Sequence, residues 1–291
     1  MYPVPLAATQ RGAFRLQGFI YNECSECGSL YVSPRPTREA LEEYYRDSKA
    51  SRYRVEHYDR DTAKARRIHL LRFHANWLGR WVNEMGNPEA RGYADLATHL
   101  PLIFEEVRSL GLFDSFWSVN PLAALEAECE AHGVEIAREP LSGLGTLTAF
   151  EKVENEFSPY ELFCGAAEML ADRGMLFFTT RTISGFDLQV LWDKAPYIFV
   201  PEHLNLLSLE GLTQLVDRSG FELVELSTPG QLDLELAAHA DAQDPSVELQ
   251  RFARRLIEHD DDEAREDFQA FLQKHRLSSH ARVAASKKGG K

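Results

Sequence analysis

Two pairs of neighbouring side chains have the types and spacing to carry out chemistry. Glu202 and His203 stand together between apolar residues and a proline. An imidazole exchanges a proton near neutral pH, and a carboxylate beside it can orient the ring. The pair is therefore a candidate for removing a proton from an acceptor molecule. A buried histidine bonded to backbone at a strand–helix corner is the alternative interpretation. The second pair, Cys24 and Cys27, has the spacing of half a zinc ribbon.

The two cysteines do not complete a zinc site by themselves. A structural zinc ion takes four ligands, usually two cysteine pairs. No upstream pair precedes Cys24, and Cys129 and Cys164 fall in expected helices. We therefore expect a degenerate ribbon in which Cys24 and Cys27 are reduced thiols without bound zinc. The acidic run 260–262 is interpreted as a helix cap and solvated turn rather than as a metal site.

The elements that must position these side chains alternate from residue 91 onwards. Strands are expected at 91–97, 115–119, 144–150, 175–180, 222–227 and 281–285, and helices at 100–110, 122–132, 160–170 and 209–219. This alternation predicts an α/β fold with a Rossmann-like, doubly wound, mostly parallel sheet. Ligands bind such sheets beyond the carboxyl ends of the strands. The first two strand–helix turns are therefore the expected site.

Other segments surround this domain. We expect a zinc-ribbon-like appendage at 1–37 with a strand over 14–21, a helical basic segment at 38–90, the main domain at 91–285 with a helical insert at 241–276, and a disordered tail at 286–291. Residues 46–80 carry ten Lys or Arg and four acidic residues, in a chain of net charge −13. This stretch is either a solvated face or a surface that attracts an anionic substrate or an acidic partner.

Charge and cysteine usage limit the partners. A net charge of −13 argues against general binding of nucleic acid, whose phosphates require Lys and Arg. No apolar run is long enough to span a bilayer, and residues 1–15 lack the pattern of a secretory leader. Four scattered cysteines fit a reducing compartment. We expect a cytoplasmic protein without a membrane span, which binds a small-molecule substrate or a protein partner, does not bind nucleic acid and can form oligomers.

Several stretches together resemble one protein family. They are Cys24-Ser25-Glu26-Cys27-Gly28-Ser29-Leu30-Tyr31-Val32-Ser33-Pro34-Arg35-Pro36-Thr37, Leu41–Tyr45, Ser184–Trp192, Pro201–Leu206 and Leu277–Arg282. The chain resembles class I S-adenosylmethionine-dependent methyltransferases with an N-terminal zinc-ribbon remnant, a type linked to surface-polysaccharide and unusual-sugar biosynthesis. The resemblance covers nearly the whole chain. It implies a seven-stranded sheet, S-adenosylmethionine as cofactor, and Glu202 and His203 as the groups that support deprotonation of a sugar acceptor.

The stretch that matches the cofactor turn of this family departs from its pattern. Asp95 stands at the acidic position, but Ala97 and His99 replace the two glycines, so that side chains narrow the turn. After the second strand, Asn120 replaces a carboxylate that would accept hydrogen bonds from both ribose hydroxyls. An amide offers fewer acceptors, and the loss is expected to weaken binding by about 1–3 kcal/mol, roughly ten- to hundredfold.

A further departure follows the strand that ends at Phe150, which we also assign to the cofactor side. Asn155 stands where the resemblance implies a histidine, and Glu151 and Glu154 are expected to be exposed turn acids. Two functions therefore stay open. One is an active methyltransferase that acts on a small, anionic or nucleotide-linked sugar metabolite. The other is a pseudoenzyme, a methyltransferase-like partner or scaffold protein that has lost S-adenosylmethionine binding.

Overall fold

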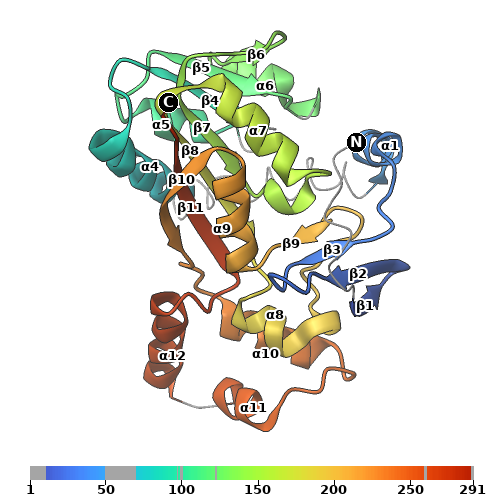
Figure 1. Cartoon of the computed structure of the whole chain (residues 1–291). Coiled ribbons are helices and arrows are strands. Elements are labelled where there is room, and N and C mark those ends of the chain that lie inside the picture. Colours follow the sequence, from blue (N-terminus) through green and yellow to red (C-terminus); the bar gives the residue numbers. More distant parts are fainter. Residues whose placement is uncertain are drawn as a thin grey trace.

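A seven-stranded sheet forms the centre of the molecule (Figure 1). The computed structural model describes residues 11–49, 70–96, 98, 101–121, 123–258 and 261–289. The strand order is β10-β11-β8-β7-β4-β5-β6, and β11 runs antiparallel to both of its neighbours. The strands are β4 (Gly92–Leu96), β5 (Ser115–Val119), β6 (Glu135–Ala137), β7 (Leu144–Phe150), β8 (Leu170–Arg181), β10 (Phe221–Ser227) and β11 (His280–Lys287). The expected doubly wound, mostly parallel sheet is therefore confirmed.

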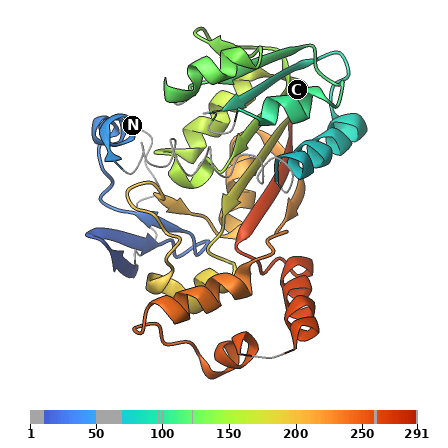
Figure 2. The same cartoon turned by 180° about the vertical axis from the view of Figure 1, so that it is seen from behind.

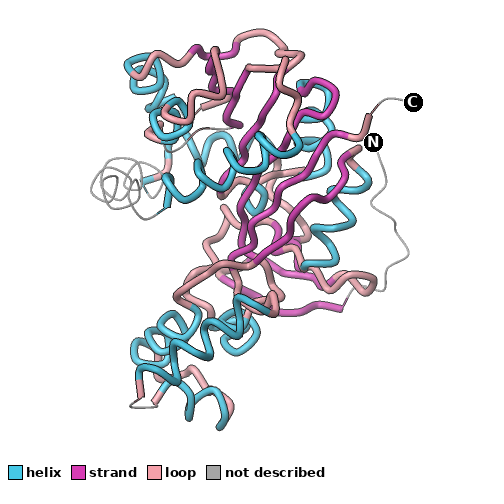
Figure 3. The backbone as a smooth tube through the Cα atoms, turned by 90° about the vertical axis from the view of Figure 1, so that its left-hand side faces the viewer, coloured by secondary structure: helices cyan, strands magenta, loops and turns pink. Residues whose placement is uncertain are grey.

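Helices cover both faces of this sheet (Figure 3). One face packs against α4 (Arg72–Met85), α5 (Ile103–Arg108) and α6 (Glu126–Ala131), and the other against α7 (Pro159–Met169) and α9 (Leu209–Arg218). Side chains of a strand alternate between the faces. Accordingly, Phe177 joins the apolar cluster under α4 and α5, and Phe178 joins the cluster under α7 and α9. The short 3-10 helices η3 (Ala123–Leu125), η4 (Val153–Asn155) and η5 (Trp192–Lys194) lie in connections.

A second, four-stranded sheet contains the N-terminal segment. Its order is β1 (Arg11–Leu16), β2 (Phe19–Glu23), β3 (Leu30–Val32) and β9 (Asn205–Leu206), and β9 comes from the middle of the chain. The expectation of one strand over 14–21 was wrong. Gln17 and Gly18 both have positive φ, at 47° and 90°, and they form the tight turn of a β1–β2 hairpin.

The carboxyl ends of the parallel strands point toward this second sheet and a group of helices (Figures 1 and 2). The group comprises α8 (Phe186–Leu191), α10 (Asp233–Gln243), α11 (Arg251–Ile257) and α12 (Asp262–Lys274). The helical insert expected from residue 241 therefore begins earlier, at Asp233. Helices α8 and α10 share one buried apolar cluster with β2, β3 and α1 (Arg38–Asp47). Added elements thus lie next to the edge where ligands bind in such folds.

The ends of two expected segments differ from the structure. Ser286 and Lys287 were expected to begin a disordered tail, but they continue β11, where Ser286 pairs with both β8 and β10. Within the segment at 38–90 that was expected to be helical, the structure shows α1 and α4, and residues 50–69 lie outside the described residues. Thr37 caps α1, and its side chain accepts a hydrogen bond from the Ala40 N–H.

Candidate functional site

Asp95 lies near the carboxyl end of β4 and is only 5% exposed. Its carboxylate accepts a hydrogen bond from the hydroxyl of Thr148 on β7, which in turn lies 2.7 Å from the hydroxyl of Tyr93. Burial raises the pKa of the Asp95 carboxyl to about 6, although hydrogen bonds from Thr148 and Thr98 act in the opposite direction. The predicted acid therefore stands at the first strand and is held by the neighbouring strand.

The other residues predicted for the cofactor side lie at adjacent strand ends. Asn120 follows β5, is exposed, and has a left-handed backbone with φ of 50°. Phe150 ends β7 and is 6% exposed, and its ring lies 4.6 Å from the ring of His74 on α4. Ala97 and His99 lie outside the described residues.

Asp95 and Asn120 lie close to each other on neighbouring strands. Asp95 is the register partner of Ser118 in the parallel β4–β5 pair, so Asn120 lies just beyond the level of Asp95 on the neighbouring strand. The exposed Asn120 amide can accept a hydrogen bond from a hydroxyl group of a ligand. It offers one acceptor oxygen where a carboxylate would offer two.

A polar group that the sequence analysis did not assign to function lies at the ends of β7 and β8. Nε2 of His280 is 2.7 Å from Oε1 of Glu151, and the Thr179 hydroxyl donates to the same oxygen at 2.9 Å. Glu151 turns away from β7 with φ of 51°. His280 begins β11, 129 residues later, and pairs with Arg181 at the end of β8. The strand register therefore brings the carboxylate and the imidazole together.

Glu154 joins this pair, and we call Glu151, Glu154 and His280 the acidic–imidazole cluster. Glu154 is 2% exposed, so the expectation of an exposed turn acid was wrong. Its carboxylate accepts a hydrogen bond of 2.7 Å from the Thr180 hydroxyl. Burial, together with the charge of Glu151, raises the pKa of Glu154 to about 7. Burial opposes the charged form of His280, but the two carboxylates outweigh it and raise the pKa of the imidazole. Perturbed titratable groups are concentrated at functional sites.

His74 borders the cluster from α4. The ring is 5% exposed, and its Nδ1 has no hydrogen-bond partner in the part of the chain that the structure describes. Burial, assisted by the charge of His280, lowers the pKa of His74 to about 3. His74 is therefore neutral at physiological pH and presents an unbonded nitrogen inside the protein.

Glu202 and His203 lie on a loop beside the cluster, because the loop backbone donates a hydrogen bond of 2.8 Å to the Glu154 carbonyl. Both side chains are buried. Glu202 Oε1 accepts a hydrogen bond from the hydroxyl of Tyr44 on α1 at 3.0 Å, and Nδ1 of His203 accepts one from the Phe199 N–H at 3.3 Å. The structure therefore brings the predicted pair to the edge of the acidic–imidazole cluster, and different elements hold the two side chains.

Cys24 and Cys27 form a turn between β2 and β3. The Gly28 N–H donates to the Cys24 carbonyl at 2.8 Å, and Cys27 Sγ lies 3.2 Å from the hydroxyl of Ser29. That hydroxyl accepts a hydrogen bond from the N–H of Ser208, the cap of α9. Within the described ranges, no group of three or more His, Cys, Asp and Glu side chains is arranged to hold a metal ion. The turn therefore connects the N-terminal sheet to α9.

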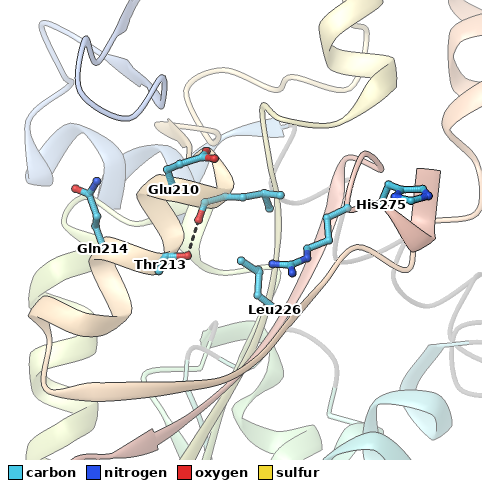
Figure 4. Close-up of a pocket in the computed structure, with 7 residues that line it drawn as sticks. Glu210, Thr213, Gln214, Leu226 and His275 are labelled. Carbon is cyan, nitrogen blue, oxygen red and sulfur yellow. Dashed lines mark hydrogen bonds between the residues drawn. The ribbon is translucent and has the colours of Figure 1, made fainter. Parts of the chain in front are cut away.

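A hollow of about 570 Å³ lies elsewhere, at the β10 end of the sheet (Figure 4). It is lined by Leu209, Glu210, Thr213, Gln214, Leu226, His275 and Arg276. Glu210, Thr213 and Gln214 belong to α9, and His275 lies on the opposite side. None of these residues belongs to the predicted site or to the acidic–imidazole cluster.

Comparison with known proteins identifies the fold. No protein-family model and no curated protein sequence matches the chain. A chain of the Haloferax volcanii complex that contains the Trm112 methyltransferase activator is similar in structure, with 11% identity, a TM-score of 0.52, and coverage of 87% of this chain and 100% of that chain. An S-adenosylmethionine-dependent methyltransferase from Mesorhizobium loti matches with 13% identity, a TM-score of 0.45, and coverage of 73% and 98%. A cyclopropane synthase from Mycobacterium tuberculosis matches with 12% identity, a TM-score of 0.43, and coverage of 73% and 83%.

The seven-stranded sheet with its single antiparallel strand β11 is the class I methyltransferase fold. In the described part of the chain, no helix has the length and apolar character needed to cross a membrane.

Proposed function

We propose that the chain is an S-adenosylmethionine-dependent methyltransferase that acts on a small anionic acceptor, such as a nucleotide-linked sugar. The observation that carries the proposal is the acidic–imidazole cluster at the carboxyl edge of a methyltransferase-type sheet. Glu154 and His280, whose pKa values are both raised, lie there with the Glu151 carboxylate, where β7 and β8 end and β11 begins. Titratable groups with perturbed pKa values are concentrated at functional sites, which supports a functional role for this edge.

The cofactor side of the proposed site consists of Asp95, Asn120 and Phe150, with Ala97 and His99 added from the sequence. Asp95 would lie on the side of the methionine part, and Asn120 would bind the ribose. When bound, S-adenosylmethionine supplies a methyl group on a sulfonium, which is displaced in line by a nucleophile. The protein then has to orient the acceptor and remove its proton.

Glu202 and His203 are proposed to assist proton removal on the acceptor side. Their loop is bonded to the Glu154 backbone, so they lie at the edge where an acceptor would meet the methyl group. The anionic character of the acceptor rests on the basic stretch 46–80, which carries six more positive than negative side chains.

One observation favours the alternative, an inactive partner protein. Asp95 is 5% exposed and already accepts a hydrogen bond from Thr148, so its carboxylate is partly used within the protein. The structurally similar Haloferax volcanii chain comes from a complex with a methyltransferase activator, and a protein partner is therefore a reasonable second proposal for this chain.

Calorimetric titration with S-adenosylmethionine and S-adenosylhomocysteine separates the two proposals. The methyltransferase proposal predicts saturable binding of both, with a dissociation constant at or above the micromolar range because Asn120 replaces a carboxylate. A folded protein that binds neither compound at millimolar concentration would support the partner proposal and contradict the enzymatic one. Circular dichroism before the titration verifies the fold.

A further inference from the structure

We propose that His280, oriented by Glu151 and Thr179, is the group that accepts the proton of the methyl acceptor. This inference rests on the proposed function and names the accepting atom, Nδ1 of His280. Glu202 and His203 would then assist proton removal indirectly, by holding the loop that is bonded to the Glu154 backbone.

The hydrogen bonds of His280 determine its tautomer. A carboxylate only accepts hydrogen bonds, so Nε2, 2.7 Å from Glu151, carries the hydrogen of the neutral ring. Nδ1 then carries the lone pair. It has no hydrogen-bond partner among the described residues, and 29% of the His280 side chain remains accessible. An imidazole held by a carboxylate at one nitrogen and open at the other is the arrangement of a general base.

The geometry of His203 is less suited to this step. Its Nδ1 accepts a hydrogen bond from the backbone N–H of Phe199 at 3.3 Å, and a backbone N–H can only donate. The neutral ring therefore carries its hydrogen on Nε2, and its lone pair is already used. The same loop is fixed a second time, since the Tyr21 hydroxyl donates to the His203 carbonyl.

Four titratable or charged side chains act on the His280 ring from the surrounding elements. Glu151 and Glu154 follow β7, Arg181 ends β8, and His74 lies on α4. The two carboxylates favour the imidazolium, Arg181 opposes it, and His74 is neutral. The balance favours the charged ring, so a proton that arrives at Nδ1 is stabilised.

The proposed step conserves atoms and charge. The proton of the acceptor O–H or N–H moves to Nδ1 of His280. The electron pair left on the acceptor atom forms the new bond to the methyl carbon, and the pair of the breaking carbon–sulfur bond stays on sulfur, which gives S-adenosylhomocysteine. The imidazolium later releases its proton to water.

The first test is an NMR titration of the histidine ring signals in the wild-type protein, which requires no acceptor. Glu151→Gln removes the charge of the positioning residue, and Glu156→Gln changes a carboxylate that pairs with Lys152 instead. We expect His280 to titrate above its ordinary pKa in the wild-type protein. The pKa of His280 should fall by about one unit in Glu151→Gln but not in Glu156→Gln. An unchanged His280 titration in Glu151→Gln overturns the inference.

The second test measures methyl transfer from S-adenosylmethionine to a panel of nucleoside diphosphate hexoses. His280→Gln keeps an amide that can bond Glu151 and lacks the basic nitrogen, and His203→Asn keeps an acceptor for the Phe199 N–H. We expect His280→Gln to lower kcat at least about 100-fold, and His203→Asn less than about tenfold. Glu151→Gln should move the acidic limb of the pH–rate profile to lower pH.

The outcomes separate this inference from the proposed function. Loss of transfer in His203→Asn with retention in His280→Gln overturns the inference and leaves the methyltransferase proposal standing. A wild-type protein that binds neither S-adenosylmethionine nor S-adenosylhomocysteine contradicts the methyltransferase proposal itself. If no probe is methylated, the ring titration decides about His280.

Discussion

At the scale of single residues, the buried carboxyl of Asp95 makes the stability of the fold depend on pH. Its carboxyl is buried near the end of β4, and its pKa is raised from 3.8 to about 6 mainly by that burial. Between these values the folded protein binds more protons than the unfolded chain, so the free energy of unfolding falls as pH rises through this window. Above pH 6 the ionised carboxyl destabilises the fold by about 3 kcal/mol.

The neutral substitution Asp95→Asn tests this account. The amide oxygen can still accept the Thr148 hydrogen bond, and no charge remains to be buried. We expect the variant to be more stable than wild type by up to about 3 kcal/mol at pH 8, and equally stable below pH 4. Urea unfolding at both pH values measures the difference. A variant that is less stable at pH 8 would show that the carboxylate stabilises the fold.

A second residue-scale prediction concerns Asn120. The substitution Asn120→Asp supplies the carboxylate that the ribose hydroxyls would bind. We expect S-adenosylhomocysteine to bind roughly ten- to hundredfold more tightly, because hydrogen bonds to a charged acceptor contribute about 1–3 kcal/mol. Asn87→Asp, at a half-buried asparagine in the loop before β4, is the control. Equal affinity of Asn120→Asp and wild type in calorimetry would contradict a ribose contact at this position.

The candidate site was only partly predictable from residue types. Glu202 and His203 are adjacent in sequence, so the sequence alone was enough to predict that they act together in proton transfer. Glu151 and His280 are 129 residues apart, and only the register of β11 against β8 brings them together. The burial of Glu154 could not be predicted from the sequence either. A carboxylate in a turn is usually solvated, and its partner Thr180 lies on a strand that comes later in the chain.

At the scale of elements, one carboxylate attaches α4 to the sheet. Glu225 on β10 accepts five hydrogen bonds, from Trp77, Arg80, Trp81, Ser227 and Arg282. Partial burial opposes ionisation, but hydrogen bonds from Ser227, Trp77 and Trp81 outweigh it and lower the pKa of Glu225. Helix α4 also carries His74, so this attachment helps to hold His74 beside the acidic–imidazole cluster.

Glu225→Gln is expected to lower the free energy of unfolding by about 1–3 kcal/mol, because several donors lose a charged acceptor. The stabilisation by the carboxylate is present above the unfolded pKa and is lost as pH falls through the lowered folded pKa, so the difference between variant and wild type should shrink in acid. Tryptophan fluorescence during denaturation at several pH values measures both the loss of stability and its dependence on pH. Glu222→Gln, exposed on the same strand, is the control, and an equal effect there would contradict the attachment.

Most strands of five or more residues could be predicted from the sequence, and strands of two or three residues could not. The strands expected at 115–119 and 144–150 match β5 and β7, because aromatic and aliphatic residues recur in each between turn residues. Strands β6 and β9 have three and two residues, too few to show a periodicity. The hairpin between β1 and β2 was missed because Gly18 was interpreted as part of a strand.

At the scale of the whole molecule, the N-terminal sheet is joined to the rest of the chain. Strand β9 pairs with β3, and Tyr21, Leu30 and Val32 are fully buried in a cluster with α8 and α10. Such shared burial makes independent unfolding of the N-terminal segment unfavourable.

Tyr21→Ala tests this coupling. Removal of a fully buried aromatic side chain costs about 3–5 kcal/mol. We expect a single unfolding transition at a lower temperature, with circular dichroism and tryptophan fluorescence changing together. Arg15 is exposed on β1, so Arg15→Ala should leave the unfolding temperature unchanged. Two separate transitions in the Tyr21→Ala protein would show that the N-terminal sheet unfolds as a unit of its own.

The central claim is that a nucleoside ligand binds at the carboxyl ends of β4 and β5. Hydrogen–deuterium exchange with and without S-adenosylhomocysteine tests this most directly, because it locates binding on the wild-type protein. We predict slower exchange in peptides that contain Leu96 and Asn120, and no change around the hollow beside α9 (Figure 4). Protection confined to α9 and β10, or no protection at saturating ligand, would contradict the account.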